Sequence, residues 1–256
     1  MIVFLPGSEQ AQKMDELVKR QELEALVGFL FSNQQFIKEV AEVVGDKYTR
    51  LDFEYWQLGY IKKATVKKSA RVRERELVEN ELKKTFVGLL RAVYDLNDND
   101  LPSESKQDKI GHLRAAIVEA LVVKILKSRY KEIGTNCQIE INESVVMLPG
   151  AVYPKTIDAA GVDDRQQPQQ GEMYECKAGS AFIEKRDLRF LTELRRRLDA
   201  ADLSEVMVAL VSFDRRAALQ RKFTKLKVKY KHMLSREDLG TLRDYGAMKA
   251  FLAGGV

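Results

Sequence analysis

Apolar residues recur at helical spacing through much of the first hundred positions. In residues 11–44 and 75–96 they fall three or four positions apart, as on the buried face of an amphipathic helix. The residues that carry this pattern are Leu17, Leu23, Leu26, Val27 and Leu30 in the first stretch, and Leu77, Leu82, Phe86, Leu89, Leu90 and Val93 in the second. The sequence therefore predicts a mainly helical N-terminal region, without an internal repeat.

The pattern changes after residue 106, where helical and strand periods alternate. Residues 109–130 and 186–200 keep the helical spacing, whereas residues 206–213 form an apolar run typical of a buried strand. Residues 173–178 alternate with a period of two. Together with a short strand over residues 158–162 and the polar turn between them, they predict an antiparallel hairpin. We expect an α/β protein in which a helical N-terminal region precedes a domain with a central mixed β-sheet flanked by helices.

A polar stretch separates the two parts. Residues 96–107, LNDNDLPSESKQ, are rich in turn and linker residues. We place the boundary here, with a helical region over residues 1–105 and a second domain over residues 106–256. The helical region is expected to sense DNA, to dimerise or to dock a partner protein, and the sequence does not choose among these roles.

Charged residues occupy the predicted hairpin. Within residues 173–178, Glu175 and Lys177 project from one face, while Tyr174, Cys176 and Ala178 project from the other. Asp158 opens the partner strand and can approach Glu175 across the hairpin. Two carboxylates beside an ammonium group suit Mg²⁺ or Mn²⁺, which prefer oxygen ligands, and the lysine can hold a water or a phosphate beside the ion.

This arrangement resembles the signature of the PD-(D/E)XK nuclease superfamily, the restriction-endonuclease-like fold, in which an acid opens one strand and Glu-x-Lys follows on the next. The matching residues are Asp158 and Glu175-Cys176-Lys177, and the order helix, hairpin, helix, strand fits over residues 106–256. The proline of the family name stands at Pro154, four positions ahead of the aspartate instead of beside it. The resemblance implies a restriction-endonuclease-like domain that hydrolyses phosphodiester bonds.

Roles for individual residues follow from the same resemblance. Asp158 and Glu175 would ligate one or two Mg²⁺ ions, for which Mn²⁺ can substitute, and the Cys176 backbone carbonyl would be a further ligand. The family adds an acid from a helix ahead of the sheet, and Glu119, the one acid of its predicted helix, would supply that ligand directly or through water. Lys177 would orient the attacking water and stabilise the charge that develops on the phosphate.

Each of these residues also has a structural interpretation. A Glu-x-Lys pair on a strand is commonly a same-face ion pair. Glu119 can instead pair with Arg114 or Lys124 on its own helix. Asp163 and Asp164 are expected to form the turn, because Asp supports the local backbone hydrogen bonds of tight turns.

Net charge is distributed unevenly along the 256 residues, whose formal charge is +5. Residues 1–105 hold 16 Lys+Arg and 18 Asp+Glu, a net of −2, whereas residues 106–256 hold 27 and 20, a net of +7. A basic domain favours a polyanionic partner, and nucleic acid is the obvious one because phosphate neutralisation dominates its binding.

Basic residues gather in the stretches 60–75, 186–197 and 215–231. The last holds eight basic residues and no acid, and it is expected to turn Leu219, Phe223 and Leu226 to the core and its charges to solvent or to a nucleic-acid backbone. Residues 60–75 are either a solvated helix face or an arm that contacts phosphates. The candidate nucleic-acid contacts are Arg189, Arg196, Arg221, Lys222, Lys225, Lys227 and Lys229, although Glu193 and Asp199 will neutralise part of the arginine helix.

Other kinds of chemistry find little support. The cysteines Cys137 and Cys176 form neither a disulfide framework nor a metal-binding spacing, and two histidines are too few for a zinc site. Cys176 is expected to pack beneath the site as a small apolar residue. The first ten residues lack the basic segment of a signal peptide, and no stretch has the length of a membrane span, so we expect a cytoplasmic protein without a membrane partner.

The expected function is Mg²⁺-dependent hydrolysis of DNA, in restriction or in defence against phages and plasmids. Two alternatives remain open: a non-catalytic nucleic-acid-binding or accessory module on the same fold, and a nuclease that cleaves RNA. Cleavage of both strands of a duplex favours a homodimer or a subunit of a larger defence or restriction complex.

Overall fold

The structure is a computed structural model that describes residues 1–46, 49–62, 70–96, 106–163, 165, 169–228, 230–244, 246 and 249–250. The side chains of residues 61, 62, 70–78, 106–109 and 241 lie outside this description. The residues between the described ranges include Asp164 and Lys229.

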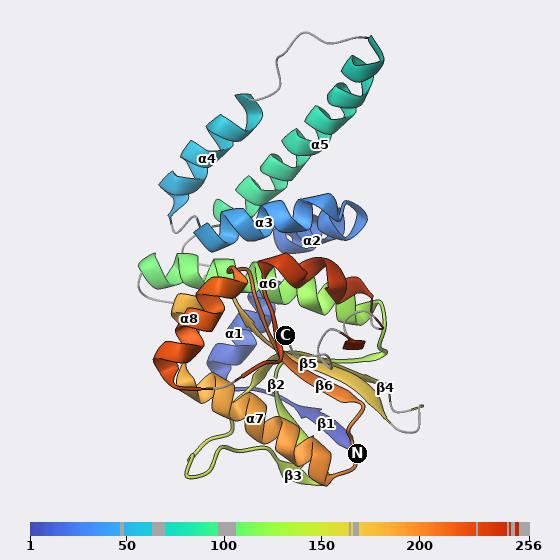
Figure 1. Cartoon of the computed structure of the whole chain (residues 1–256), viewed down its shortest axis with the longest axis vertical. Coiled ribbons are helices and arrows are strands. Elements are labelled where there is room, and N and C mark those ends of the chain that lie inside the picture. The colour runs from blue at the N-terminus through green and yellow to red at the C-terminus, as the bar shows by residue number, and fades with distance from the viewer. Residues whose placement is uncertain are drawn as a thin grey trace.

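Seven strands of the described chain form one mixed sheet (Figure 1). The order along it is β1-β2-β4-β5-β6-β7, with β3 paired to β2. The pairs from β1 to β5 are antiparallel, whereas β5, β6 and β7 run parallel. The strands are β1 (Ile2–Leu5), β2 (Glu132–Ile141), β3 (Ser144–Val145), β4 (Ile157–Asp163), β5 (Gln170–Lys177), β6 (Val206–Ser212) and β7 (Met233–Leu234).

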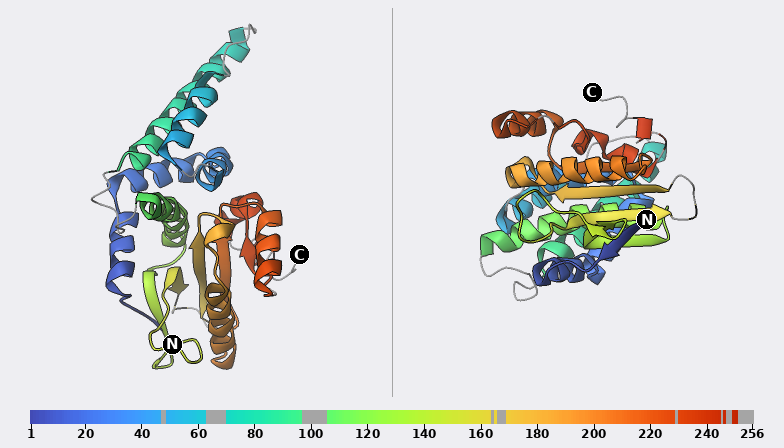
Figure 2. Two further views of the ribbon diagram at one scale, coloured as in Figure 1. Left: turned by 90° about the vertical axis from the view of Figure 1, so that its left-hand side faces the viewer. Right: turned by 90° about the horizontal axis from the view of Figure 1, so that it is seen from below.

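Helices cover both faces of the sheet (Figure 2). One face packs against α6 (Lys106–Lys127) and, behind it, the N-terminal helices α1 (Glu9–Val18), α2 (Gln21–Ser32) and α3 (Gln35–Asp46). The other face packs against α7 (Lys185–Ala200) and α8 (Arg216–Leu226). Two hydrophobic clusters result because successive residues of β5 and β6 alternate between the faces: Tyr174 and Cys176 join the first cluster and Met173 the second. The predicted α/β class, with a mixed sheet flanked by helices, is confirmed.

The helices α4 (Arg50–Lys62) and α5 (Ala70–Tyr94) project away from the sheet as an antiparallel pair (Figure 1). The described residues also include two 3₁₀ helices, η2 (Ser180–Phe182) and η3 (Arg236–Arg243). No helix within the described ranges is both long and apolar enough to span a membrane.

The hairpin predicted around the charged patch is formed by β4 and β5. Its register pairs Ala159 with Tyr174 and Asp163 with Gln170. Asp163 ends β4 and accepts hydrogen bonds from the Arg165 backbone and guanidinium, as expected of a turn residue. Asp164 lies outside the described residues.

Residues on both sides of the expected boundary share one core. β1 pairs with β2, and the first hydrophobic cluster runs from Met14 through α6 to Leu242. On α6, the buried Arg114 donates from Nε to the Val44 carbonyl at 2.5 Å and from Nη2 to the Gly45 carbonyl at 3.0 Å, which holds the end of α3. Residues 97–105, where the boundary was expected, lie outside the described residues.

Candidate active site

Asp158 and Glu175 occupy neighbouring positions on adjacent strands. They directly precede and follow the register pair Ala159 and Tyr174 of β4 and β5. The Cys176 backbone N–H donates to Asp158 Oδ2 at 2.6 Å, which fixes that carboxylate against β5. Burial, and next to it the Glu175 carboxylate, raise the pKa of Asp158 from 3.8 to about 6. Two acids therefore meet in a site with little water to screen them.

Glu175 is fully buried and faces two ammonium groups. Lys155 Nζ lies 2.7 Å from both of its carboxylate oxygens, and Lys177 Nζ lies 2.6 Å from Oε1. Burial alone would raise the pKa of Glu175, but Lys177 and then Lys155 outweigh it, so the pKa is lowered. Glu175 is therefore an anion in this arrangement.

Lys177 bridges the two acids. Besides its contact with Glu175, its Nζ lies 4.0 Å from Asp158 Oδ2. Burial alone would lower the pKa of Lys177, but the carboxylates of Glu175 and Asp158 raise it well above its ordinary value. Lys177 therefore remains a cation, suited to binding an anion and unsuited to accepting a proton.

Glu119 reaches the same site from α6. Its side chain is buried, and its Oε2 accepts a hydrogen bond from Asn136 Nδ2 at 3.1 Å. Burial, and next to it the charge of Asp158, raise the pKa of Glu119 well above its ordinary value. The alternative in which Glu119 pairs with Arg114 or Lys124 is wrong, because Arg114 is bound to the end of α3 and Lys124 is exposed.

Asn136 was not predicted from the sequence, and its backbone explains its place. It lies in β2 between the register pairs Thr135 with Ala159 and Cys137 with Ile157, opposite Asp158. Its φ of 45° is in the left-handed region, which Asn tolerates better than most residues. The sequence holds no distinct signal for it, because β2, EIGTNCQIEI, contains several other polar residues.

Lys155 and Asp187 were also missed. Lys155 lies in the segment before β4, and Asp187 lies in the first turn of α7. Asp187 Oδ1 is 3.3 Å from Lys155 Nζ, and Oδ2 accepts from the Glu184 backbone N–H at 2.8 Å. Asp187 completes the capping box of α7 and at the same time positions Lys155. The sequence indicates the cap, but no local pattern links the cap to a lysine 32 positions earlier.

The carboxylates of Glu119, Asp158 and Glu175 are the kind of ligand that a hard divalent cation prefers, but they are not arranged around a common point. Within the described residues, no group of three or more His, Cys, Asp or Glu side chains is arranged to hold a metal ion. Burial and, next to it, a neighbouring carboxylate raise the pKa values of Asp158 and Glu119, and a bound cation would stabilise both groups as anions. The Cys176 side chain packs in the first hydrophobic cluster, as expected of a small apolar residue.

The candidate nucleic-acid contacts differ in how available they are. Arg189, Arg221, Lys225 and Lys227 are exposed. Lys222 donates to the Ala181 carbonyl at 3.1 Å, and Arg196 forms an ion pair with Glu193 at 2.5 Å. Leu219 and Phe223 of α8 are buried, as predicted, and Leu226 is partly buried. Lys229 and residues 63–69 of the first basic stretch lie outside the described residues.

No protein-family model matches the chain, and no curated protein matches it. Among solved structures, the crystal structure of protein VC1899 from Vibrio cholerae is similar, with a TM-score of 0.42 and 16% sequence identity. The similarity covers 98% of this chain and 64% of that chain, so this chain spans less than two thirds of the Vibrio protein.

Proposed function

We propose that the protein is a Mg²⁺-dependent nuclease that hydrolyses phosphodiester bonds in DNA. One observation carries the proposal: three acids from three elements, the buried Glu119 and Glu175 and the partly buried Asp158, lie together beside the cation of Lys177. Structural ion pairs rarely place three acids together in a core, because each buried charge is costly. The resemblance to the PD-(D/E)XK signature names the same four residues.

In this proposal Asp158 and Glu175 hold the metal, and Glu119 adds a ligand directly or through water. The bound Mg²⁺ would lower the pKa of a water molecule and stabilise negative charge on the phosphate. Lys177 holds the attacking water and the phosphate oxygens by charge. The Cys176 backbone N–H keeps Asp158 oriented, and Asn136 orients Glu119.

The proposed setting is restriction or defence against phages and plasmids, in the cytoplasm, and it rests on the resemblance. DNA as the substrate is supported by the net charge of +7 over residues 106–256 and by the exposed cations on α8. RNA would meet the same charges, so the substrate is decided by experiment.

The test is incubation of the purified protein with plasmid, linear duplex, single-stranded DNA and RNA, each with Mg²⁺, Mn²⁺ or EDTA. We expect cleavage of DNA that requires the metal. Asp158→Asn, Glu175→Gln and Lys177→Met should each lower the rate by about 100-fold or more, because each removes a group from the reacting centre. Asp199→Asn on the exposed side of α7 is the matched control and should leave the rate unchanged. Wild-type rates in Asp158→Asn or Glu175→Gln would remove the site assignment.

A second candidate function is a non-catalytic nucleic-acid-binding module. It is favoured by the contact of Lys155 with both carboxylate oxygens of Glu175. These are the oxygens with which Glu175 would bind a metal ion, and the lysine already occupies them. Binding of duplex DNA without cleavage of any substrate under any of the metal conditions would support this candidate against the nuclease.

We also propose that a second copy of the chain binds along α4. Leu51, Tyr55 and Leu58 lie at i, i+4 and i+7, on one side of the helix, and are 57%, 69% and 56% exposed. A two-fold axis would pack this stripe against itself. Antiparallel pairing would also set the two helix dipoles in opposite directions, with the start of each α4 beside the end of its partner.

Sedimentation equilibrium tests this interface. The wild type should be a dimer, and the triple variant Leu51→Ser, Tyr55→Ser, Leu58→Ser should be a folded monomer. Lys83→Ser, Lys84→Ser on α5 is the control and should remain dimeric. A monomeric wild type at micromolar concentration would contradict the proposal.

A further inference from the structure

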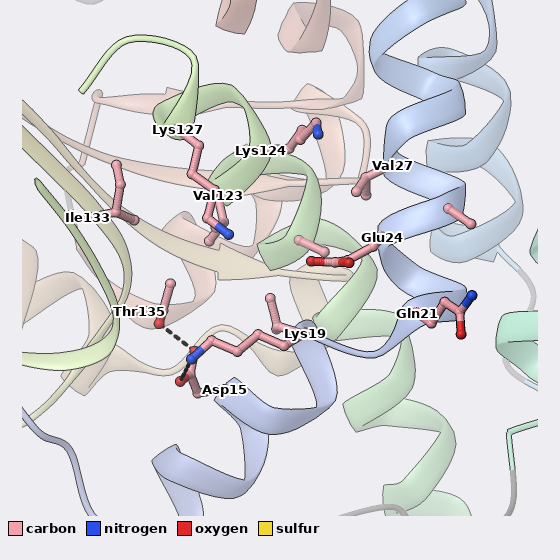
Figure 3. A pocket seen from close by; sticks show the side chains of 13 residues that line it. Asp15, Lys19, Gln21, Glu24, Val27, Val123, Lys124, Lys127, Ile133 and Thr135 are labelled. Atoms are coloured by element: carbon pink, nitrogen blue, oxygen red, sulfur yellow. Dashed lines mark hydrogen bonds and ion pairs between the residues drawn. The ribbon is translucent and has the colours of Figure 1, made fainter. Parts of the chain in front are cut away.

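A pocket of about 530 Å³ lies between α1, α2, α6 and β2 (Figure 3). Its volume is in the range of small-molecule binding sites. The floor is apolar, with the buried residues Val18, Val27 and Val123 contributed by three different helices. The pocket is separate from the Asp158 and Glu175 site, since neither residue lines it.

Charged groups surround this floor, and they divide into two sets. Asp15 is already satisfied, because Lys19 Nζ lies 2.5 Å from its Oδ2 and Thr135 Oγ1 donates to its Oδ1. Glu24, Lys124 and Lys127 also line the pocket, and none of them has an ion pair within the described part of the chain. Figure 3 shows Lys127 and Glu24 extending over the cavity from different helices, α6 and α2.

This pattern defines the chemistry of a ligand. Lys124 and Lys127, one turn apart on α6, can together bind a phosphate. Glu24 is a hydrogen-bond acceptor that faces them across an apolar floor, and it would bind an amino group on a flat apolar ring. We propose that the pocket binds a mononucleotide whose base carries an exocyclic amine, with its phosphate at Lys124 and Lys127 and its amine at Glu24.

The position of the pocket connects it with the candidate active site. Ala120 lines the pocket and directly follows Glu119, and Thr135 lines it and directly precedes Asn136. The hydrogen bond between Glu119 and Asn136 therefore joins the same two elements, α6 and β2, that a nucleotide in the pocket would contact. Occupancy of the pocket is expected to change the rate of cleavage, and this part of the inference rests on the proposed nuclease function.

Binding is measured by isothermal titration calorimetry with AMP in the presence of EDTA and without DNA, so that it does not depend on catalysis. We expect AMP to bind more tightly than inosine monophosphate, which lacks the amine, and more tightly than adenosine or inorganic phosphate. Glu24→Gln should remove most of the preference for AMP over inosine monophosphate. Lys124→Gln, Lys127→Gln should weaken AMP binding by about tenfold or more, as expected for loss of charge-assisted hydrogen bonds.

Two further variants distinguish AMP binding in the pocket from general effects of charge and folding on affinity. Ala25 is exposed and lines the pocket, so Ala25→Trp should fill it and abolish AMP binding without disturbing the core. Lys83→Gln, Lys84→Gln removes the same charge from α5 and should leave the affinity unchanged. Thermal melting of each variant should match that of the wild type.

Absence of AMP binding to the wild type, or binding that Ala25→Trp leaves intact, would overturn the site. Equal affinity for inorganic phosphate and AMP would reduce it to a simple anion site and overturn the assigned ligand class. If AMP binds in the pocket and the wild type cleaves DNA at an unchanged rate, the connection with Glu119 and Asn136 is wrong. If the protein binds AMP but cleaves nothing, the nucleotide site stands and the nuclease proposal fails.

Discussion

Lys155 Nζ lies 2.7 Å from each carboxylate oxygen of Glu175. The contact ties the segment before β4 to the C-terminal part of β5, and Asp187 of α7 holds the lysine from its other side. In the absence of a metal ion, Lys155 and Lys177 supply the positive charge that makes a buried Glu175 tolerable. A cation bound by Glu175 would compete with Lys155 for the same oxygens.

Replacement of Lys155 should have opposite effects on the stability of the metal-free protein and on its affinity for a metal ion. Lys155→Met should lower the free energy of unfolding in EDTA by about 1–3 kcal/mol, because Glu175 keeps one ammonium partner in place of two. The same variant should bind Mn²⁺ more tightly, because a competitor is removed. Urea unfolding and calorimetry measure the two effects. Lys83→Met, which breaks an ion pair on α5, is the control and should cost less than about 1 kcal/mol. Weaker Mn²⁺ binding by Lys155→Met would make Lys155 part of the metal site instead of its competitor.

Asp158 should make the metal-free protein less stable as the pH rises. Its pKa is about 6 in the folded state and 3.8 ordinarily, so the folded state holds the proton more tightly. Its contribution is therefore fully present below about pH 3.8 and is lost as the pH rises through 6, for a total of about 2–3 kcal/mol at about 1.4 kcal/mol per unit of pKa. Asp158→Asn keeps an acceptor for the Cys176 N–H and should lose this dependence.

Urea unfolding of the wild type and Asp158→Asn between pH 4 and 8 in EDTA measures the difference. The variant should be the more stable protein above pH 6. Parallel stability curves would show that Asp158 does not carry the raised pKa. Addition of Mg²⁺ should lessen the wild type's loss of stability, because a bound cation favours the carboxylate.

Local patterns were sufficient for the elements that carry the candidate site. The helical spacing around Glu119 corresponds to α6, and the alternation around Glu175 corresponds to β5, because burial on one face imposes those periods directly. The same alternation separated Glu175 and Lys177 from the core residues Tyr174 and Cys176. Charged residues inside such patterns are conspicuous because a core excludes them unless they are paired.

What could not be predicted depends on contacts between distant residues. β1 adds to the sheet through β2, and its four residues carry no strand period long enough to recognise. Residues 11–44 looked like one helical stretch but form α1, α2 and α3, which end at short turns that apolar spacing does not reveal. Lys155 and Asn136 reach the site through tertiary placement, and neither belongs to a sequence motif.

At Gly7 the backbone passes so close to β2, beside the candidate site, that a side chain does not fit. A Cβ at Gly7 would overlap the Asn136 carbonyl oxygen and lie 2.7 Å from Ala11 Cβ and 2.9 Å from Thr156 Cγ2. Gly7→Ala should therefore lower the free energy of unfolding by about 1–3 kcal/mol, the cost of overpacking. It should also displace Asn136 and reduce cleavage. A Cβ at Gly28 in α2 would have no atom within 4 Å. Because Ala favours a helix more than Gly does, Gly28→Ala should stabilise the protein by up to about 1 kcal/mol. Equal melting temperatures for both variants would contradict the close approach.

A fragment of residues 106–256 should not fold on its own. It would lose β1, leave the α6 side of the first hydrophobic cluster in water, and remove the Val44 and Gly45 carbonyls that satisfy the buried Arg114. We expect a fragment without a cooperative thermal transition, whereas the whole chain melts cooperatively. A soluble fragment with a cooperative transition that binds Mn²⁺ would support the boundary expected near residue 105.

The exposed cations of α8 and of its C-cap residue Lys227 should contact the nucleic-acid backbone. Arg221, Lys225 and Lys227 are exposed and have no ion pair within the described part of the chain. Each phosphate contact contributes about 0.9 to the slope of log affinity against log salt for duplex DNA, so the triple change to Gln should reduce that slope by about 2–3. Affinity should fall alike for all sequences, because backbone contacts do not read bases. Arg196→Gln is the control, since Arg196 is neutralised by Glu193 and should leave the slope unchanged. An unchanged slope in the triple variant would assign these residues to a solvated face and direct the search for the DNA path to Arg189 and the rest of α7.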